Sequence, residues 1–397
     1  SPESGPLKRM CAAALRPQAA SKSNSLAPLQ IAKKRRLLCG RQETGIQRDV
    51  GNIEVGNDVY RSVSKGQYIF VKKPEGDRQF NMLLADLGPY FEHVKPIVET
   101  GSNRMFFVSK TEYEKVKPGG CQDLVYGCYS CRSKPCPPSV RTMFKLYDGR
   151  QITVFPATAS VPNGSAEIVF KFGLMMSPQK APWASLGISL KDYESERYPP
   201  FMSQLGKLGV SKSYALYVDA RKLAGRLIFG DEDPSKQDGI LRYVSTWESG
   251  LGPPAIDMLS VLVGDDCKDE IKDDNAAFFA SGSSFIQIPA SHKQTVLELL
   301  RSAGIKRVEV KEESGFFKVA CEAIDYLPSI TFFLKGLDGR KVPLAISPRT
   351  LKGQLKDGQC VLALEFGKFW YLGLPAVIGN YFSVNKTHIG FTKAVLQ

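Results

Sequence analysis

Residues 278–289 of this 397-residue chain read FFASGSSFIQIP. Two phenylalanines close a strand-like apolar burst, a turn of small residues from Ala280 to Ser284 follows, and an Ile/Pro segment leads into a helical pattern. The helix is expected over residues 291–303, with an apolar stripe formed by Val296, Leu297, Leu299 and Leu300. The glycine of the turn permits a sharp reversal, and its serines supply hydroxyl groups. The stretch therefore predicts a strand, a hydroxyl-lined turn and a helix.

The composition is that of a β-rich globular protein. Glycine (35) and proline (25) are plentiful, and hydrophobic residues make up 43% of the chain. Short apolar bursts separated by Gly/Pro turns favour strands over a helical bundle. A chain of this length is able to bury one large core or two ordinary ones. No apolar run reaches the roughly 18 residues that span a bilayer, so no transmembrane segment is expected.

The net charge of +13 is concentrated near the N-terminus, where residues 1–50 hold ten Lys/Arg and three Asp/Glu, a net +7. We expect residues 1–54 to form a basic, pro-segment-like extension whose partner is an acidic surface. Nucleic acid is not expected as a partner, because no nucleic-acid-binding motif accompanies the charge. The three histidines lack metal-ligand spacing and no phosphate-binding glycine loop occurs, so neither a metal nor a cofactor is expected.

Further stretches follow one another in a fixed order. They are GRLIFGDEDPSK (225–236), CEAIDYLPSITF (321–332), WYLG (370–373), NYFSV (380–384) and IGF (389–391). Together with the turn at Ala280, this order resembles that of the pepsin-like aspartic peptidase family. The resemblance implies an all-β, bilobal acid-protease fold, with a few short helices and two β-barrel-like lobes around a central cleft. The lobes are expected at residues 55–212 and 213–397.

The resemblance assigns roles to individual residues. Aspartic peptidases use two aspartates, one in each lobe within an Asp-Thr/Ser-Gly-Thr/Ser motif, that share one proton and activate a water molecule. Here Ser281, Gly282 and Ser283 match the second motif, but Ala280 stands where its aspartate is expected. General acid–base help is worth about 10²–10⁴-fold per group, so we expect no peptidase activity. Tyr147 falls where the family carries its flap tyrosine, although an ordinary hairpin tyrosine would give the same sequence.

The first motif is expected within residues 83–89, LLADLGP. Asp86 and Gly88 keep the Asp-x-Gly spacing, but the residue after each of them lacks the hydroxyl group of the family motif. A rival register puts Ala85 at the aspartate position and leaves no catalytic carboxylate. The decay of this motif indicates a natural loss at Ala280, while an engineered Asp→Ala change there would give the same residue.

Six of the nine cysteines have expected pairings. By resemblance, Cys321 and Cys360 form the disulfide of the second lobe. Four others crowd into one loop and predict two local disulfides: Cys121, Cys128, Cys131 and Cys136. A zinc site is the alternative, which the absence of a neighbouring histidine disfavours. The cysteine content favours an oxidising compartment, so we expect the secretory pathway, with an extracellular or vacuolar destination.

Three functional hypotheses follow. The first is a pseudo-peptidase that binds a protein or peptide in the inter-lobe cleft, because strand-lined grooves bind extended peptides well. The second is an active aspartic endopeptidase whose native sequence has aspartate at position 280, or which works through a divergent site. The third is a structural subunit of a larger assembly, anchored by the basic extension.

Overall fold

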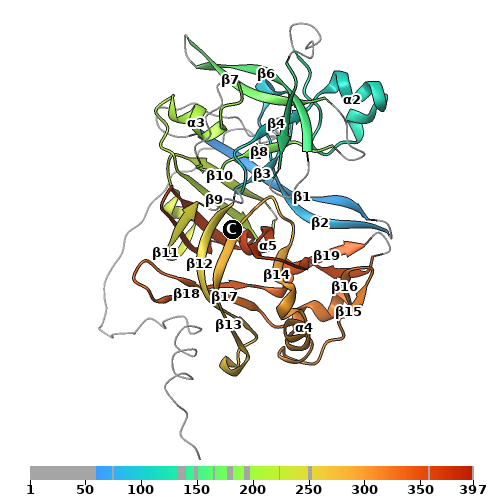
Figure 1. Cartoon of the computed structure of the whole chain (residues 1–397), viewed down its shortest axis with the longest axis vertical. Helices are drawn as coiled ribbons and strands as arrows, with labels where there is room; N and C mark the ends of the chain where they lie inside the picture. Colours follow the sequence, from blue (N-terminus) through green and yellow to red (C-terminus); the bar gives the residue numbers. More distant parts are fainter. Residues whose placement is uncertain are drawn as a thin grey trace, which may run out of the picture. The chain divides into compact units, whose positions relative to one another are not determined.

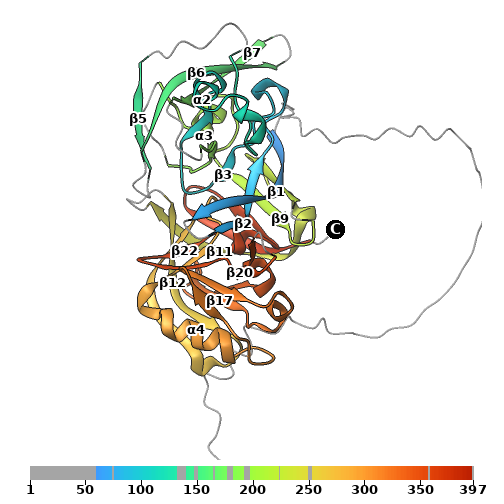
Figure 2. The same ribbon diagram turned by 90° about the vertical axis from the view of Figure 1, so that its right-hand side faces the viewer.

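The computed structural model describes residues 60–73, 76–131, 140–146, 151–163, 166–176, 182–191, 197–222, 224–248, 253–355 and 358–395. The chain divides into two units, Ser1–Val50 and Gly51–Gln397, and every described residue belongs to the second. The predicted basic extension, residues 1–54, therefore lies outside the described residues. Strands dominate the second unit and its α-helices are short, which confirms the predicted all-β architecture (Figure 1, Figure 2). Among the described residues, no helix is long and apolar enough to cross a membrane.

One antiparallel sheet links strands that are far apart in the sequence. Its strands pair in the order β1 (Tyr60–Lys73), β10 (Ala224–Phe229), β9 (Tyr214–Asp219), β23 (Asn380–Val384), β24 (His388–Ala394) and β11 (Gln237–Glu248). All of β9 is buried, and so is all of β23 except Ser383. The sheet therefore joins the beginning, the middle and the end of the described chain through a buried centre.

Two sets of strands repeat one pairing scheme. In the first set, β3 (Ile97–Glu99) runs parallel to β8 (Ser185–Gly187), while β4 (Met105–Val108) pairs antiparallel with β8 and parallel with β7 (Ala166–Met175). In the second set, β13 (Glu270–Phe279) runs parallel to β22 (Trp370–Leu372), while β14 (Ile286–Pro289) pairs antiparallel with β22 and parallel with β21 (Leu364–Gly367). The two halves of the sequence are thus built on one plan, and β3 and β13 end at equivalent points. The lobe boundary at residues 212/213 stays a prediction.

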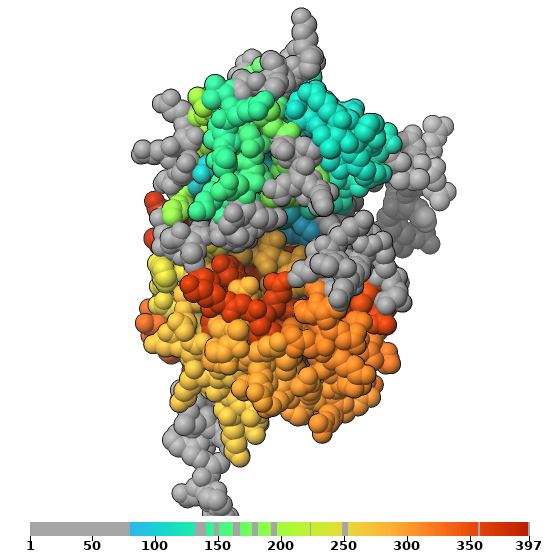
Figure 3. Space-filling model, turned by 45° about the vertical axis from the view of Figure 1, so that its right-hand side comes forward, coloured from blue at the N-terminus to red at the C-terminus, as the bar shows by residue number. Residues whose placement is uncertain are grey.

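The remaining strands extend these two sets. They are β2 (Gly76–Ala85), β5 (Thr142–Lys145), β6 (Gln151–Asn163), β12 (Pro254–Val263), β15 (Lys311–Glu313), β16 (Phe316–Val319), β17 (Ile330–Lys335), β18 (Lys341–Ile346), β19 (Lys352–Leu355) and β20 (Cys360–Leu362). Figure 3 shows one face of the molecule, with green and cyan residues of the first half above orange and red residues of the second.

The described α-helices are α2 (Lys110–Val116), α3 (Phe201–Gly206), α4 (Lys293–Ser302) and α5 (Leu374–Val377). The helix predicted after residue 290 is α4, which a single turn of 3₁₀-helix precedes. Its apolar stripe faces the core: Val296, Leu297 and Leu300 are buried, and Leu299 packs against the core with part of its surface exposed.

Disulfides connect the described cysteines. The pairing of Cys321 with Cys360 is present, and Cys121 is joined to Cys128 within the cysteine-rich loop. Cys131 and Cys267 are disulfide-bonded as well. Cys136, the fourth cysteine of the loop, lies outside the described residues.

Two glycines allow the backbone of each half to pass close to its neighbour. A Cβ atom added to Gly187 would lie 2.4 Å from the backbone nitrogen of Arg104, and one added to Gly373 would lie 2.0 Å from the carbonyl oxygen of Phe285. Gly187 ends β8 and Gly373 directly follows β22, so the two glycines occupy matching positions in the repeated scheme. Only glycine fits at these crossings.

Several side chains hydrogen-bond to Asp273 and fix β13, the strand that leads to Ala280. The Trp370 Nε1 donates to Asp273 Oδ2 at 2.8 Å, His292 Nε2 lies 2.9 Å from the same oxygen, and the Asn275 amide donates to Oδ1. The His292 ring stacks on the indole of Trp370, with centroids 5.5 Å apart. Burial acts to raise the pKa of the Asp273 carboxyl, but these hydrogen bonds outweigh burial and hold the pKa below its ordinary value.

We expect Gly373→Ala to destabilise the protein by about 3 kcal/mol or more, because the added methyl group meets rigid backbone atoms. Urea unfolding measures the effect. The matched control is Gly206→Ala at the end of α3, where the nearest atom to a new Cβ is the flexible Lys212 Cε at 3.4 Å. This control should change stability by less than about 1 kcal/mol. Equal effects of the two variants would contradict the role given to Gly373.

We expect Asp273→Asn to lower stability at neutral pH by about 1–3 kcal/mol, because a charged hydrogen-bond acceptor is lost. The folded-state pKa of Asp273 lies below its unfolded value, so the carboxylate's contribution is complete above a pH of about 4 and is lost as the pH falls further. The stability difference from wild type should therefore stay constant above about pH 5 and shrink in more acidic urea titrations. Exposed Asp274, replaced by Asn, serves as the control and should cost less than about 0.5 kcal/mol.

Candidate functional site

The turn that follows β13 is hydrogen-bonded to Leu372, the last residue of β22, and to Leu374 just beyond this strand. Ala280 is 2% exposed, and its backbone N–H donates to the carbonyl oxygen of Leu372 at 3.1 Å. The Ser283 N–H donates to the Ala280 carbonyl at 2.9 Å, and the Ser283 carbonyl accepts from the Leu374 N–H at 2.7 Å. These bonds fix the turn, to which Ala280 contributes a buried methyl group.

Two buried hydroxyl groups tie this turn to the end of β3. The Thr100 Oγ1 donates to the Phe279 carbonyl at 3.0 Å and accepts from the Ser281 N–H at 2.9 Å. In return, the Ser281 Oγ donates to the Val98 carbonyl at 2.7 Å and accepts from the Thr100 N–H at 3.1 Å. Thr100 and Ser281 are 0% and 1% exposed, so the four bonds are shielded from water. The result is a reciprocal arrangement in which each hydroxyl donates once and accepts once.

Glu99 reaches toward the second turn from the end of β3. A Cβ atom on Gly282 would lie 2.6 Å from the Glu99 Cγ and 3.4 Å from its Oε1, so the glutamate side chain passes directly over this glycine. The sequence Glu-Thr-Gly-Ser at residues 99–102 matches Ala-Ser-Gly-Ser at residues 280–283 position by position. The reciprocal hydrogen bonds join the second residue of each segment. Residues 99–102 therefore form the first-half counterpart of the Ala280 turn.

Asp86 and Gly88, the residues predicted for the first motif, lie elsewhere. Asp86 follows β2, and its Oδ1 accepts from the Gly88 N–H at 2.8 Å and lies 3.4 Å from the His93 Nδ1. Gly88 has a φ of 75° and begins a 3₁₀ turn, so this pair forms a local loop. The structure does not bring Asp86 to the Ala280 turn by hydrogen bonds; those that reach this turn involve Val98 and Thr100.

A signal for the correct segment was present in the sequence. The run from Ile97 to Val108 reads IVETGSNRMFFV, an apolar pair followed by a Thr-Gly-Ser turn and a second apolar burst. The first residue of this turn is Glu99, so a pattern that requires aspartate does not find it. The hydroxyl of Thr100 identifies this turn, because it makes the buried hydrogen bonds to the Ala280 turn.

We call residues 99–102 and 280–283 the two motif turns. Their first residues present one carboxylate, that of Glu99, and one methyl group, that of Ala280. Peptide hydrolysis by a pair of acids uses two carboxylates, of which one acts as base and the other as acid. Tyr147, the predicted flap tyrosine, lies outside the described residues. In the part of the chain that the structure describes, no group of three or more His, Cys, Asp or Glu side chains is arranged to hold a metal ion.

Comparisons with known proteins agree with this architecture. The family model described as eukaryotic aspartyl protease matches residues 179–394, more than half of the chain. Pepsin II-2/3 of Oryctolagus cuniculus is 24% identical over 214 residues, which are 50% of this chain and 50% of that protein. Cathepsin E of Aquarana catesbeiana is 26% identical over 43% of this chain and 41% of its own length. Pregnancy-associated glycoprotein 2 of Bos taurus is 22% identical over 72% of this chain and 79% of its own length.

The match to the first two relatives spans half of the rabbit protein and 41% of the frog protein.

We expect Thr100→Val to lower the free energy of unfolding by about 2–4 kcal/mol, because it leaves the buried Ser281 N–H and Phe279 carbonyl without their partner. Thr100→Ser keeps the hydroxyl and removes only a methyl group, so it should cost roughly 1 kcal/mol. Urea unfolding of both variants tests the reciprocal bonds. Equal losses for valine and serine would show that the hydroxyl does not stabilise the junction.

Proposed function

Because the chain belongs to the eukaryotic aspartyl protease family, we propose that it is a non-catalytic member, a pseudo-peptidase that binds a protein or peptide segment in its inter-lobe cleft. The observation that carries the proposal is Ala280 at the second motif turn, next to the reciprocal hydrogen bonds of Thr100 and Ser281. The hydrogen-bonded framework of the site is retained, although one of its two acids is absent.

The chemistry of amide hydrolysis supports inactivity. One group must take a proton from the attacking water while another protonates the carbonyl oxygen and later the leaving amine. The Glu99 carboxylate is able to fill one of these roles at a time. The methyl group of Ala280 has no proton to give and no lone pair to accept one. Paired groups act non-additively, so the loss of one removes most of the benefit of both.

The retained framework supports binding. Gly282 still lies under the Glu99 side chain, and the buried hydroxyls still join the two motif turns. Strand-rich clefts bind extended peptides through backbone hydrogen bonds, which need no catalytic acid. The disulfides Cys121–Cys128 and Cys321–Cys360 support a location in the secretory pathway, where such bonds persist.

An active endopeptidase is the second candidate, and Glu99 is the observation that favours it. A carboxylate still occupies the first-motif position, so an aspartate at position 280 in the native sequence would complete a pair of acids. The two candidates differ in one residue, and a single substitution separates them.

A fluorogenic peptide assay between about pH 3 and 6 should show no cleavage by the chain with Ala280, since general acid–base pairs are worth about 10²–10⁴-fold per group. Ala280→Asp should raise the cleavage rate by at least about 10²-fold, and Ala280→Asp combined with Glu99→Asp should restore the family pair. Ala280→Asn is the matched control, with the same size as aspartate and no acid.

Cleavage by the unmodified chain that pepstatin inhibits would overturn the proposal of inactivity. Binding is tested separately by passing a mixed peptide library over the immobilised protein, with peptides retained and released uncut as the expected result. Failure to retain any peptide would overturn the binding role. Comparison of the full chain with one lacking residues 1–54 shows whether the captured partner depends on the basic extension.

A further inference from the structure

The chain contains two Asn-x-Ser/Thr triplets, at residues 163–165 and 385–387, and this triplet is the acceptor sequence for N-linked glycosylation. The first triplet lies partly outside the described residues. The second joins β23 to β24 as the loop of a hairpin, in which the Asn385 N–H donates to the His388 carbonyl at 3.1 Å. A short loop between antiparallel strands is a surface position that accommodates a bulky sugar chain.

The side chain of Asn385 folds back over its own loop. Its Oδ1 accepts from the backbone N–H groups of Thr387 at 2.9 Å and His388 at 3.0 Å, and from the Thr387 hydroxyl at 3.1 Å. Backbone N–H groups only donate, so the atom that they meet is the amide oxygen, and the other terminal atom is the nitrogen. All three donors lie within three residues of Asn385, so this turn forms without help from distant segments of the chain.

The amide nitrogen of Asn385 has one bonded hydrogen and one open hydrogen. Nδ2 donates to the His388 Nε2 at 2.7 Å, which is its one hydrogen-bond partner among the described residues. A primary amide carries two hydrogens, and N-linked glycosylation replaces one of them. The open hydrogen can therefore be exchanged for a sugar while the bond to His388 and the three bonds of the amide oxygen persist.

The Asn385 amide lies on the solvent side of the sheet. In the pairing of β11 with β24, Ser245 lies opposite His388. Ser245 is exposed, whereas its neighbour Val244 is buried. Residues directly opposite each other in an antiparallel pair project to the same face, so the His388 ring projects toward solvent together with Ser245. There it meets the exposed Tyr243 ring edge-on, with centroids 5.2 Å apart, and it contacts the Asn385 amide on this same face.

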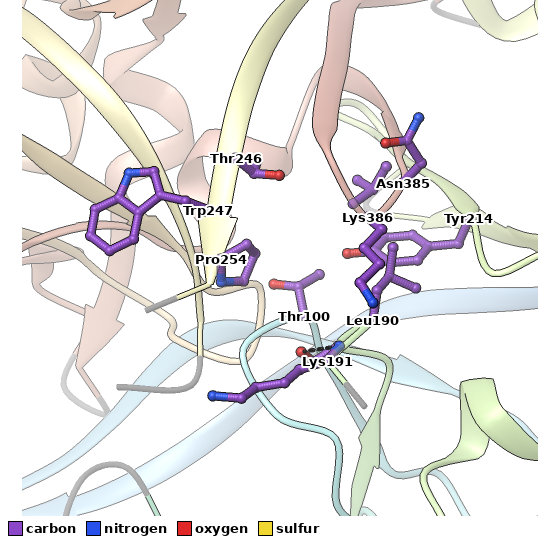
Figure 4. A pocket seen from close by; sticks show the side chains of 11 residues that line it. Thr100, Leu190, Lys191, Tyr214, Thr246, Trp247, Pro254, Asn385 and Lys386 are labelled. Carbon is purple, nitrogen blue, oxygen red and sulfur yellow. Dashed lines mark hydrogen bonds between the residues drawn. The ribbon is translucent and has the colours of Figure 1, made fainter. Parts of the chain in front are cut away.

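The same hairpin borders a small cavity (Figure 4). The cavity has a volume of about 40 Å³, and Thr100, Tyr214 and Asn385 are among the residues that line it. The Asn385 amide group points away from Thr100 in this view, and the next two residues of the loop, Lys386 and Thr387, are exposed. A sugar attached to Nδ2 would therefore extend from the rim of the cavity into solvent and would not fill the interior.

We propose that Asn385 is an N-glycosylation site that is occupied when the chain passes through the secretory pathway, an inference that rests on the secretory location given with the proposed function. The sugar donor is an oligosaccharide linked to a lipid pyrophosphate. The Asn385 Nδ2 forms a bond to C1 of the first sugar, the bond between C1 and the pyrophosphate oxygen breaks, the lipid pyrophosphate leaves, and one amide proton is released. The two motif turns take no part in this step.

The full chain, fused to a secretion signal, is expressed in insect cells and recovered from the medium and from the microsomal fraction. Glycosidase treatment in heavy-oxygen water converts each occupied asparagine to labelled aspartate, which peptide mapping locates. We expect label at residue 385 in the wild type and in Thr387→Ser, which keeps the hydroxyl of the triplet. Asn385→Asp keeps the acceptor oxygen and removes the nitrogen that carries the sugar, while Thr387→Val keeps that nitrogen and removes the hydroxyl. Both of these variants should lose the glycan at this position.

Unmodified Asn385 in wild-type protein from both fractions would overturn the proposal, and so would equal occupancy in Thr387→Ser and Thr387→Val or label at Asn163 alone. The Cys321–Cys360 disulfide, read in the same peptide map, reports that the chain has entered an oxidising compartment. Each preparation is also tested for peptide retention. A glycan without retention would count against the binding role alone, and retention without a glycan would count against the Asn385 site alone.

Discussion

Thr100 and Ser281 each give one hydrogen bond and receive one across the junction of the two motif turns, and much of the structure is arranged to make those four bonds possible. Thr100 directly follows β3 and Ser281 lies two residues after the end of β13, so that each hydroxyl bonds to backbone atoms at the end of the other strand. This arrangement fixes where β3 and β13 stop. It also requires β8 and β22 to run alongside them, with Gly187 and Gly373 allowing the close approach.

The residues that make these structural bonds differ from the acids that catalyse hydrolysis in aspartic peptidases. The residues that hold the turns together are a threonine, a serine and small residues, and none of them is an acid. None of the four bonds uses the side chain of residue 280, so the methyl group of Ala280 is compatible with an intact junction.

The sequence predicts those parts of the fold in which the residue types themselves determine the local structure. The turn at residues 280–283 was recognised because its serine and glycine survive between a strand and the amphipathic helix α4, whose apolar stripe has the expected spacing. The Asp-x-Gly spacing at Asp86 predicts a motif, yet such triplets also form ordinary loop turns of the kind seen at Gly88. The segment from residue 97 to 102 has glutamate in place of aspartate, so its hydroxyl and glycine are the informative residues. The cavity lined by Thr100 and Tyr214 is formed by segments far apart in the chain, so spacing along the sequence does not reveal it.

Strand β24 has a consequence for how the protein is made. It pairs with β23 on one side and β11 on the other, and β23 in turn covers β9. Without residues 380–394, β9 and the part of β11 that pairs with β24 would each present an unpaired strand edge, and such edges pair readily with other polypeptides. A chain shortened at this strand would therefore be exposed to aggregation through these edges.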